Sequence, residues 1–178
     1  MRMLTGCAMG VKKKTGEMQL GPVTTVVTLP HYARMIGPNG DEWQHEYSVT
    51  LTVPLGAVTD TTRFQFKPLT GTDIISGPPG LMFAQRAFEV TAFRFGQGVH
   101  QFSQPLTITV NYSDTDVVGL KGETLHLWYR NSKGEPWAKL GEPVRVMSGT
   151  HVYTTTHLTQ FALFAEAAYR VFLLMIIR

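Results

Sequence analysis

Apolar and polar residues alternate with a period of two along much of the chain. The clearest case is EYSVTLTVP, where Tyr47, Val49, Leu51 and Val53 share one face and hydroxyl side chains share the other. This period is typical of a β-strand with one buried face. Four later stretches repeat it, and their predicted buried residues are Phe64 and Phe66; Phe88, Val90 and Ala92, continued after a β-bulge by Phe93 and Phe95; Leu106, Ile108, Val110 and Tyr112; and Leu125, Leu127 and Tyr129.

Turn signals separate these stretches at hairpin-like intervals. Asn39-Gly40 is the strongest of them. Further short strands are predicted at 23–30, 136–140, 143–147, 151–156 and 160–165, and no stretch has the period of an amphipathic helix. The sequence therefore predicts an all-β protein, an antiparallel β-sandwich of about eight to ten short strands.

The predicted sandwich occupies one domain, residues 21–166. The chain has 178 residues, of which 43% are hydrophobic and 16% charged, enough for one substantial core. Residues 1–20 show no sustained period, which predicts a poorly ordered lead-in, and residues 167–178 form an apolar tail. The Gly- and Pro-containing stretch from Leu69 to Gln85 is predicted to be a long loop that caps the sandwich or binds a ligand.

Charge and cysteine content exclude several classes of protein. The net charge is +3, but the only basic run is Lys12-Lys13-Lys14, so nucleic-acid binding is not expected. Cys7 is the single cysteine, which rules out an intrachain disulfide and a cysteine metal cluster. The most apolar run, Val171–Ile177, is far shorter than the roughly 20 residues of a transmembrane helix.

No catalytic motif or cofactor site emerges from the polar residues. The six histidines are dispersed, without an His-x-His pair or an HExxH motif, so no cofactor is expected. Asn111, Asp114 and Asp116 in NYSDTD could offer oxygens to Ca²⁺. The alternative is a plain turn in which these side chains bond to their own backbone.

Two tryptophans are candidates for a carbohydrate-binding surface. Trp43 and Trp128 are expected to be exposed, where their rings could stack on sugars. The alternative is that an outward-facing tryptophan covers a second layer or a neighbouring domain. Trp137, which follows NSKGEP, is expected instead to pack on the core from the return of a hairpin.

Several motifs together resemble those of ZU5-like domains. VTLTVPLGAV resembles the opening signature of these domains, a strand that runs into proline, glycine and alanine, and Pro54, Gly56, Ala57 and Val58 occupy those positions. Later strands of the family resemble FSQPLTITVNY, ETLHLWYRNSKGEPW and THLTQFALFA. The resemblance covers residues 23–165. It implies a non-enzymatic β-sandwich module of an exported or cell-surface bacterial protein, extracellular or associated with the cell envelope, whose partner is another protein or a neighbouring domain.

The tripeptide His157-Leu158-Thr159 suggests a second function, because some ZU5-type domains and adhesion-receptor domains cleave themselves at similar triplets. By this resemblance, His157 would take the proton of the Thr159 hydroxyl, and the oxygen would attack the Leu158–Thr159 peptide bond. The chemistry also requires a strained bond and donors for the oxyanion. The alternative is that the triplet only begins the last strand, with both polar side chains bonded locally.

Overall fold

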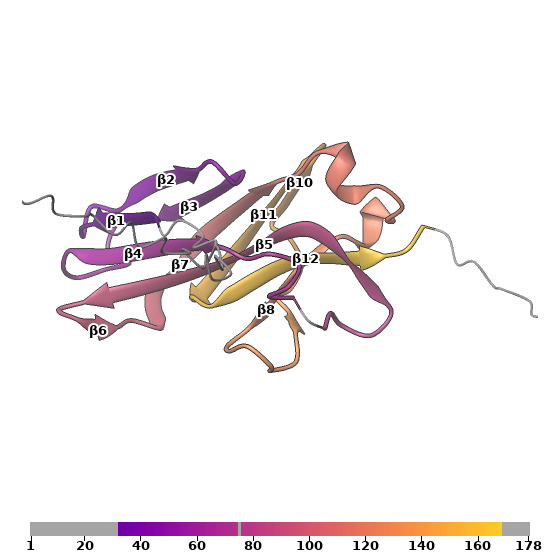
Figure 1. Cartoon of the computed structure of the whole chain (residues 1–178). Helices are drawn as coiled ribbons and strands as arrows, with labels where there is room; N and C mark the ends of the chain where they lie inside the picture. Colours follow the sequence, from indigo (N-terminus) through magenta and orange to yellow (C-terminus); the bar gives the residue numbers. More distant parts are fainter. Residues whose placement is uncertain (1–31, 75, 169–178) are drawn as a thin grey trace, which may run out of the picture.

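The computed structural model describes residues 32–74 and 76–168, which form two antiparallel sheets packed face to face (Figure 1). The predicted all-β sandwich is therefore confirmed. The predicted strand 23–30, the lead-in 1–20 and the apolar run of the tail lie outside the described residues. Within the described ranges, no helix is long and apolar enough to span a membrane.

Sheet A contains seven strands, and sheet B contains five. In spatial order, sheet A consists of β1 (Tyr32–Ile36), β4 (Thr62–Pro68), β5 (Leu81–Arg94), β12 (Gln160–Glu166), β8 (His126–Arg130) and β9 (Ala138–Lys139), with β6 (Gln97–Gly98) paired to the end of β5. Sheet B consists of β10 (Arg145–Met147), β11 (Thr150–His157), β7 (Gln101–Asn111), β3 (Val49–Val53) and β2 (Asp41–His45). Two short 3₁₀ turns, η1 (Asp114–Val117) and η2 (Gly122–Thr124), connect β7 to β8.

The core between the sheets is built from the alternating residues that the sequence marks. In β3 every second residue is buried, and β4 and β7 repeat this pattern. Tyr153 of β11 also joins the two sheets, because its hydroxyl accepts a 3.0 Å hydrogen bond from the Leu127 N–H of β8. The buried alternating residues are Val49, Leu51, Val53, Phe64, Phe66, Phe88, Val90, Ala92, Leu106, Ile108, Val110, Leu125 and Leu127.

The strand inventory differs from the prediction in length and number. The described residues contain twelve strands instead of eight to ten, and β5 and β7 have 14 and 11 residues instead of being short. The long loop ends at residue 80 instead of 85, because β5 already begins at Leu81. The irregularity in β5 lies near Gln85, which has a positive φ of 54°. The register of the β5–β12 pairing shifts at this point, between Ala162 and Phe164 of β12.

The prediction for Phe93 and Phe95 is wrong. No bulge follows Ala92, since Ala92 and Phe93 pair in regular register with Phe64 and Arg63 of β4. Successive side chains of a strand point to opposite faces, so Phe93 faces outward. It is 36% exposed, and Phe95 beyond it is 83% exposed.

The outer face of sheet A carries a second apolar cluster. Trp137, 8% exposed, packs edge to face on Phe164 of β12 at 5.3 Å between ring centroids. Leu69 and Ile74 also pack on this cluster, and a Cβ on Gly77 would lie only 2.7 Å from the Phe164 ring. Trp137 is thus buried as predicted, but on the far side of sheet A from the central core.

Candidate functional site

The triplet His157-Leu158-Thr159 forms the corner at which the chain leaves sheet B and enters sheet A. His157 ends β11, and β12 begins at Gln160, so two residues make the crossing. Leu158 and Thr159 are both buried. A buried corner of this kind must hold its polar groups by hydrogen bonds within the protein.

Thr159 meets that requirement through contacts with two strands of sheet A. Its hydroxyl donates to the carbonyl oxygen of Arg130 at the end of β8. Its own carbonyl accepts a 3.0 Å hydrogen bond from the Val90 N–H of β5. Thr159 therefore anchors the start of β12 between its two neighbouring strands.

His157 is bound to a different partner, Thr155. The His157 N–H donates to Thr155 Oγ1 at 3.2 Å, and ring atom Nδ1 lies 3.3 Å from the same oxygen. The ring also packs edge to face on Tyr129, with 4.7 Å between centroids, and burial lowers its pKa. Among the described residues, His157 and Thr159 share no hydrogen bond, so the base–nucleophile contact of the self-cleavage hypothesis is not formed in this conformation.

A hollow of about 460 Å³ opens beside this corner. Its lining comes from the segment that leads into β7 (His100 and Gln101), from the end of β8 (Tyr129 and Asn131) and from residues 157–159. These segments are distant in sequence, so the sequence alone gave no sign of the hollow. It is polar and holds both sequence-predicted catalytic candidates.

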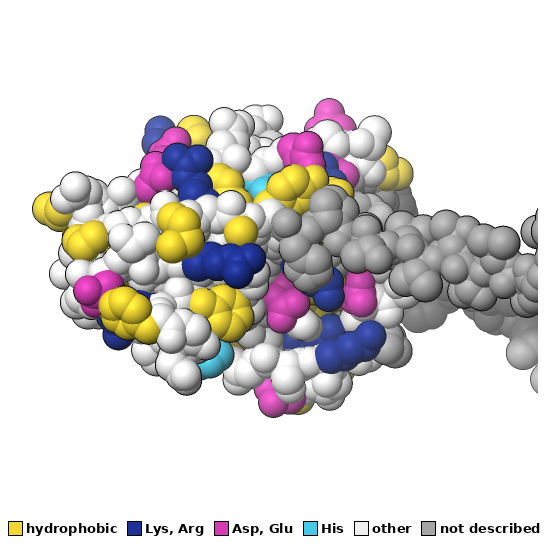
Figure 2. All heavy atoms as spheres, turned by 60° about the vertical axis from the view of Figure 1, so that its left-hand side comes forward, with side chains coloured by type: hydrophobic (Ala, Val, Ile, Leu, Met, Phe, Trp, Pro, Cys, Tyr) yellow, Lys and Arg dark blue, Asp and Glu magenta, His cyan; other side chains and the backbone are white. Residues whose placement is uncertain are grey.

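A second surface feature was missed by the sequence reasoning because Phe93 and Phe95 were assigned to the core. A hollow of about 580 Å³ lies on the outer side of sheet A, lined by Met35 of β1, Arg63 of β4, Phe93 of β5 and Phe95. We call these four residues the open face. Figure 2, which brings this end of the molecule forward, shows hydrophobic side chains at the surface beside basic ones.

Phe95 occupies a tight turn that aromatic residues rarely adopt. Arg94 pairs with Gln97, so Phe95 and Gly96 form the two-residue turn between β5 and β6, with φ values of 51° and 79°. Positive φ at both positions is the requirement of a type I′ turn, which prefers Asn-Gly. The signal available in the sequence was Gly96 directly after Phe95, because a glycine there marks a turn and places Phe95 in that turn instead of in the buried face.

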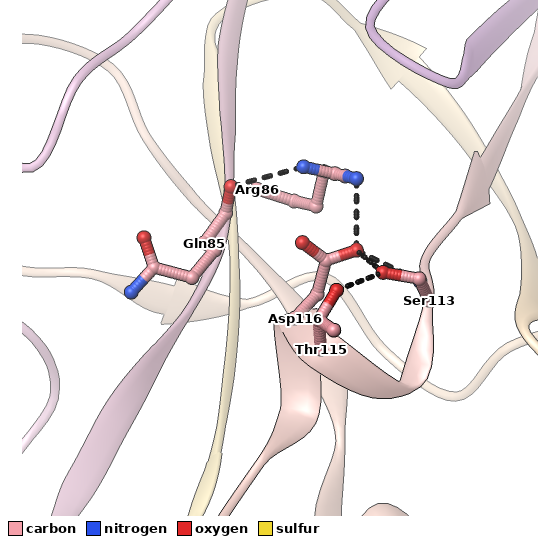
Figure 3. Close-up of polar contacts among 5 residues, drawn as sticks. All are labelled: Gln85, Arg86, Ser113, Thr115 and Asp116. Atoms are coloured by element: carbon pink, nitrogen blue, oxygen red, sulfur yellow. Dashed lines mark hydrogen bonds and ion pairs between the residues drawn. The ribbon is translucent and has the colours of Figure 1, made fainter.

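Of the residues considered for Ca²⁺, Asp116 belongs to a turn network with Ser113 and Arg86 (Figure 3). Asp116 Oδ2 accepts hydrogen bonds from the N–H and hydroxyl of Ser113, each at 2.7 Å, and forms an ion pair with Arg86 at 2.8 Å. Asn111 Oδ1 accepts a hydrogen bond from Thr150 of β11. Over residues 32–74 and 76–168, no three His, Cys, Asp or Glu side chains gather in a way that could hold a metal, and Asp114 is exposed beside the network.

The two candidate sugar-binding tryptophans do not form a common surface. Trp43 of β2 is 9% exposed and belongs to the central core, so its expected exposure is wrong: its side chain alternates inward with His45. Trp128 of β8 is half-buried against the second cluster, as in the alternative of an outward tryptophan that covers another layer. A ring buried like that of Trp43 has no face free for a sugar.

Comparison with models of known protein families and with curated proteins finds no match for this chain. The ZU5-like resemblance therefore depends on its motif residues. Of these, Pro54 directly follows β3, Gly56 adopts a positive φ of 77°, and Ala57 and Val58 are buried. This is the strand-to-turn geometry that the motif implies, although the same geometry occurs in other sandwich proteins.

Proposed function

We propose that this chain is a non-enzymatic, ZU5-like interaction module of an exported or cell-surface bacterial protein, and that it docks a protein partner or a neighbouring domain on the open face. The observation that carries the proposal is the exposure of Phe95, 83%, at the tip of the β5–β6 hairpin. The exported setting follows from the ZU5-like motifs.

The open face combines features that stability alone does not account for. Met35 is 60% exposed, and it lies in the same row as Arg63 and Phe93 across β1, β4 and β5. Three large exposed apolar side chains gather around one hollow, which is typical of an interaction site. Phe95 also holds a backbone conformation that costs about 1 kcal/mol or more for a non-glycine residue. Its ring gains little burial in return within the chain.

Arg63 indicates the chemistry of the partner. Its guanidinium makes no hydrogen bond or ion pair with the described residues, unlike Arg94, which lies 2.5 Å from Thr59 Oγ1 and 3.7 Å from Asp60. Arg63 lies between the apolar side chains of Met35 and Phe93. Charge complementarity then favours a partner that places a carboxylate opposite Arg63, surrounded by apolar residues that cover Phe93 and Phe95.

The non-enzymatic part of the proposal is supported by how the polar groups are used. Thr159, Asp116 and Asn111 all bond within the protein, and these bonds hold strands and turns together. A nucleophile needs a hydrogen-bonded base, and a metal site needs converging ligands. His157 contacts the hydroxyl of Thr155 instead of that of Thr159, and no three His, Cys, Asp or Glu side chains of the described residues gather into a metal site.

A photo-crosslinking experiment tests the proposal. A benzophenone amino acid is placed at Phe95 and, as the control, at Val146 of β10, which is 60% exposed on sheet B. The crosslinking is carried out in cells that naturally express the protein. Position 95 is expected to give one defined adduct, with a separate protein or with an adjoining domain, and position 146 is expected to give none. The purified partner must then bind the wild type at least tenfold more tightly than Phe95→Asn or Arg63→Ala. Equal crosslinking at both positions, or unchanged affinity of both variants, would refute the proposal.

A further inference from the structure

The polar hollow at the β11–β12 corner has the composition of a small-ligand site that is separate from the open face. Its volume of about 460 Å³ is within the range of ligand pockets, roughly 300–1,000 Å³. It is lined by His100, Gln101, Tyr129, Asn131 and the triplet 157–159, which includes no Asp, Glu, Lys or Arg. An ionic ligand would therefore meet no opposite charge there.

The hydrogen-bonding groups of this hollow are largely unused by the protein. The side chains of His100, Gln101 and Asn131 and the hydroxyl of Tyr129 make no hydrogen bond to another described residue. Nε2 of His157 is shielded from solvent and also has no hydrogen-bond partner there. The Asp116 network of Figure 3 is the opposite case, because Oδ2 of Asp116 is bonded to both Ser113 and Arg86.

The ring of His100 lies close to a glycine. A Cβ on Gly98 would lie 3.0 Å from His100 Nε2, tighter than ordinary side-chain contacts. Glycine at this position in β6 leaves room for the imidazole, which lines the hollow, to lie close to the strand. The other side of the hollow is fixed by the Tyr129–His157 ring pair and by the buried Thr159.

We propose that this hollow binds a neutral saccharide. Amides supply a donor and an acceptor side by side, and the imidazoles and the phenol supply further hydrogen-bonding atoms, which matches the adjacent hydroxyls of a sugar ring. A purely apolar ligand would leave these groups without hydrogen bonds, which is unfavourable inside a binding site. The ring of Tyr129 adds an aromatic surface for the apolar side of the sugar. The site lies away from Trp43 and Trp128, the tryptophans considered for sugar binding from the sequence.

The test is a titration of the full-length, ¹⁵N-labelled protein with a panel of neutral mono- and disaccharides that includes cellobiose, maltose and N,N′-diacetylchitobiose. At least one saccharide is expected to shift the side-chain amide signals of Gln101 and Asn131 saturably. Gln101→Ala and Asn131→Ala should each weaken binding at least fivefold. Gln104→Ala, at an exposed glutamine on the same strand β7 outside the hollow, is the matched control and should bind as the wild type does.

Three outcomes would overturn the proposal: no saturable shift with any saccharide of the panel, equal affinity of the wild type and both hollow variants, or stronger binding of glucuronate or of a capped dipeptide than of every neutral sugar. Unchanged amide spectra away from the hollow confirm that Gln101→Ala and Asn131→Ala are folded, so a loss of binding reports on the site. The result is independent of docking on the open face, since Phe95→Asn should leave saccharide affinity unchanged.

Discussion

The two halves of the outer face of sheet A differ sharply, although the same strand, β5, runs through both. Over β12 and β8, Leu69, Ile74 and Trp137 from the segments before β5 and after β8 cover the sheet and bury Phe164. Over β1, β4 and the end of β5, no described segment covers the sheet, and Met35, Phe93 and Phe95 remain exposed. We infer that the chain completes the first half itself and leaves the second half for a partner.

The arginines of the two halves show the same difference. Arg130 is 3% exposed; it donates to Gln160 and to the Asp73 carbonyl at 2.8 Å each and lies 4.5 Å above the Trp137 ring. Burial lowers its pKa, a cost that these contacts offset. Arg63 has no such contacts among the described residues. The guanidinium of Arg130 therefore has a structural role, and we propose that the guanidinium of Arg63 contacts the partner.

The largest predicted effect is on the covered half. Trp137→Ala removes a buried indole and should lower the free energy of unfolding by about 3–5 kcal/mol. Phe95→Ala, the matched aromatic truncation on the open half, should change it by less than about 0.5 kcal/mol, since the ring is exposed. Urea denaturation of both variants measures this. Similar losses in the two variants would remove the distinction between the halves.

Arginine truncation should give the next largest difference. Arg130→Ala deletes two hydrogen bonds of a charged donor and should cost about 1.5–3 kcal/mol of unfolding free energy. Arg63→Ala should leave stability within about 0.5 kcal/mol of the wild type. Thermal unfolding monitored by circular dichroism compares them, and a destabilised Arg63→Ala would show that Arg63 already has a structural role.

Acid should lower the free energy of unfolding through the histidines of the interior, none of which lies on the open face. Burial lowers the pKa of His151, His126, His157 and His45 below the usual 6.5, so the folded state binds fewer protons than the unfolded chain. Stability is therefore complete above about pH 6.5 and falls as the pH decreases below it. The urea midpoint measured at a series of pH values checks this sign. His151→Gln, which removes the most buried of these rings, should flatten the profile, and a midpoint that rises on acidification would contradict it.

Phe95→Asn should produce a smaller effect of opposite sign. Asparagine suits the positive φ of the first position of a type I′ turn better than phenylalanine does. The variant should therefore gain about 1 kcal/mol or less of stability while its docking weakens. Differential scanning calorimetry measures the gain, and a lower melting temperature would indicate that the Phe95 ring already stabilises the isolated chain.

The smallest predicted effect concerns the corner at Leu158–Thr159. Because His157 and Thr159 bond to Thr155 and Arg130 instead of to each other, the peptide bond should stay intact. A denaturing gel of the purified protein should show one band near 19.8 kDa. A fragment that begins at Thr159, absent in Thr159→Ala, would establish self-cleavage and overturn the non-enzymatic proposal.

The regular strands could be predicted from the sequence, and the surface could not. Alternation identified Val49, Leu51 and Val53 and the inward residues of β4 and β7 because strict period two leaves a single face for burial. It misplaced Phe93 and Phe95, since apolar character alone does not tell a core residue from an exposed one. It could not tell which face Trp43 would occupy.

The candidate sites were even less accessible from sequence. The triplet 157–159 stood out in the sequence, but whether His157 would bond to Thr155 or to Thr159 depends on the local turn. The hollow beside it draws residues from three separate segments, and the open face from three strands, neither with any local motif. Only the pairing of the strands brings these side chains together.

Hydroxyl-radical footprinting tests most directly whether the open face is left for a partner. Met35, Phe93 and Phe95 should be oxidised rapidly in the isolated chain and protected in the complex with the crosslinked partner, whereas Trp137 should be protected in both. Equal oxidation of Phe95 in the free and bound protein, or rapid oxidation of Trp137 in the isolated chain, would contradict the account.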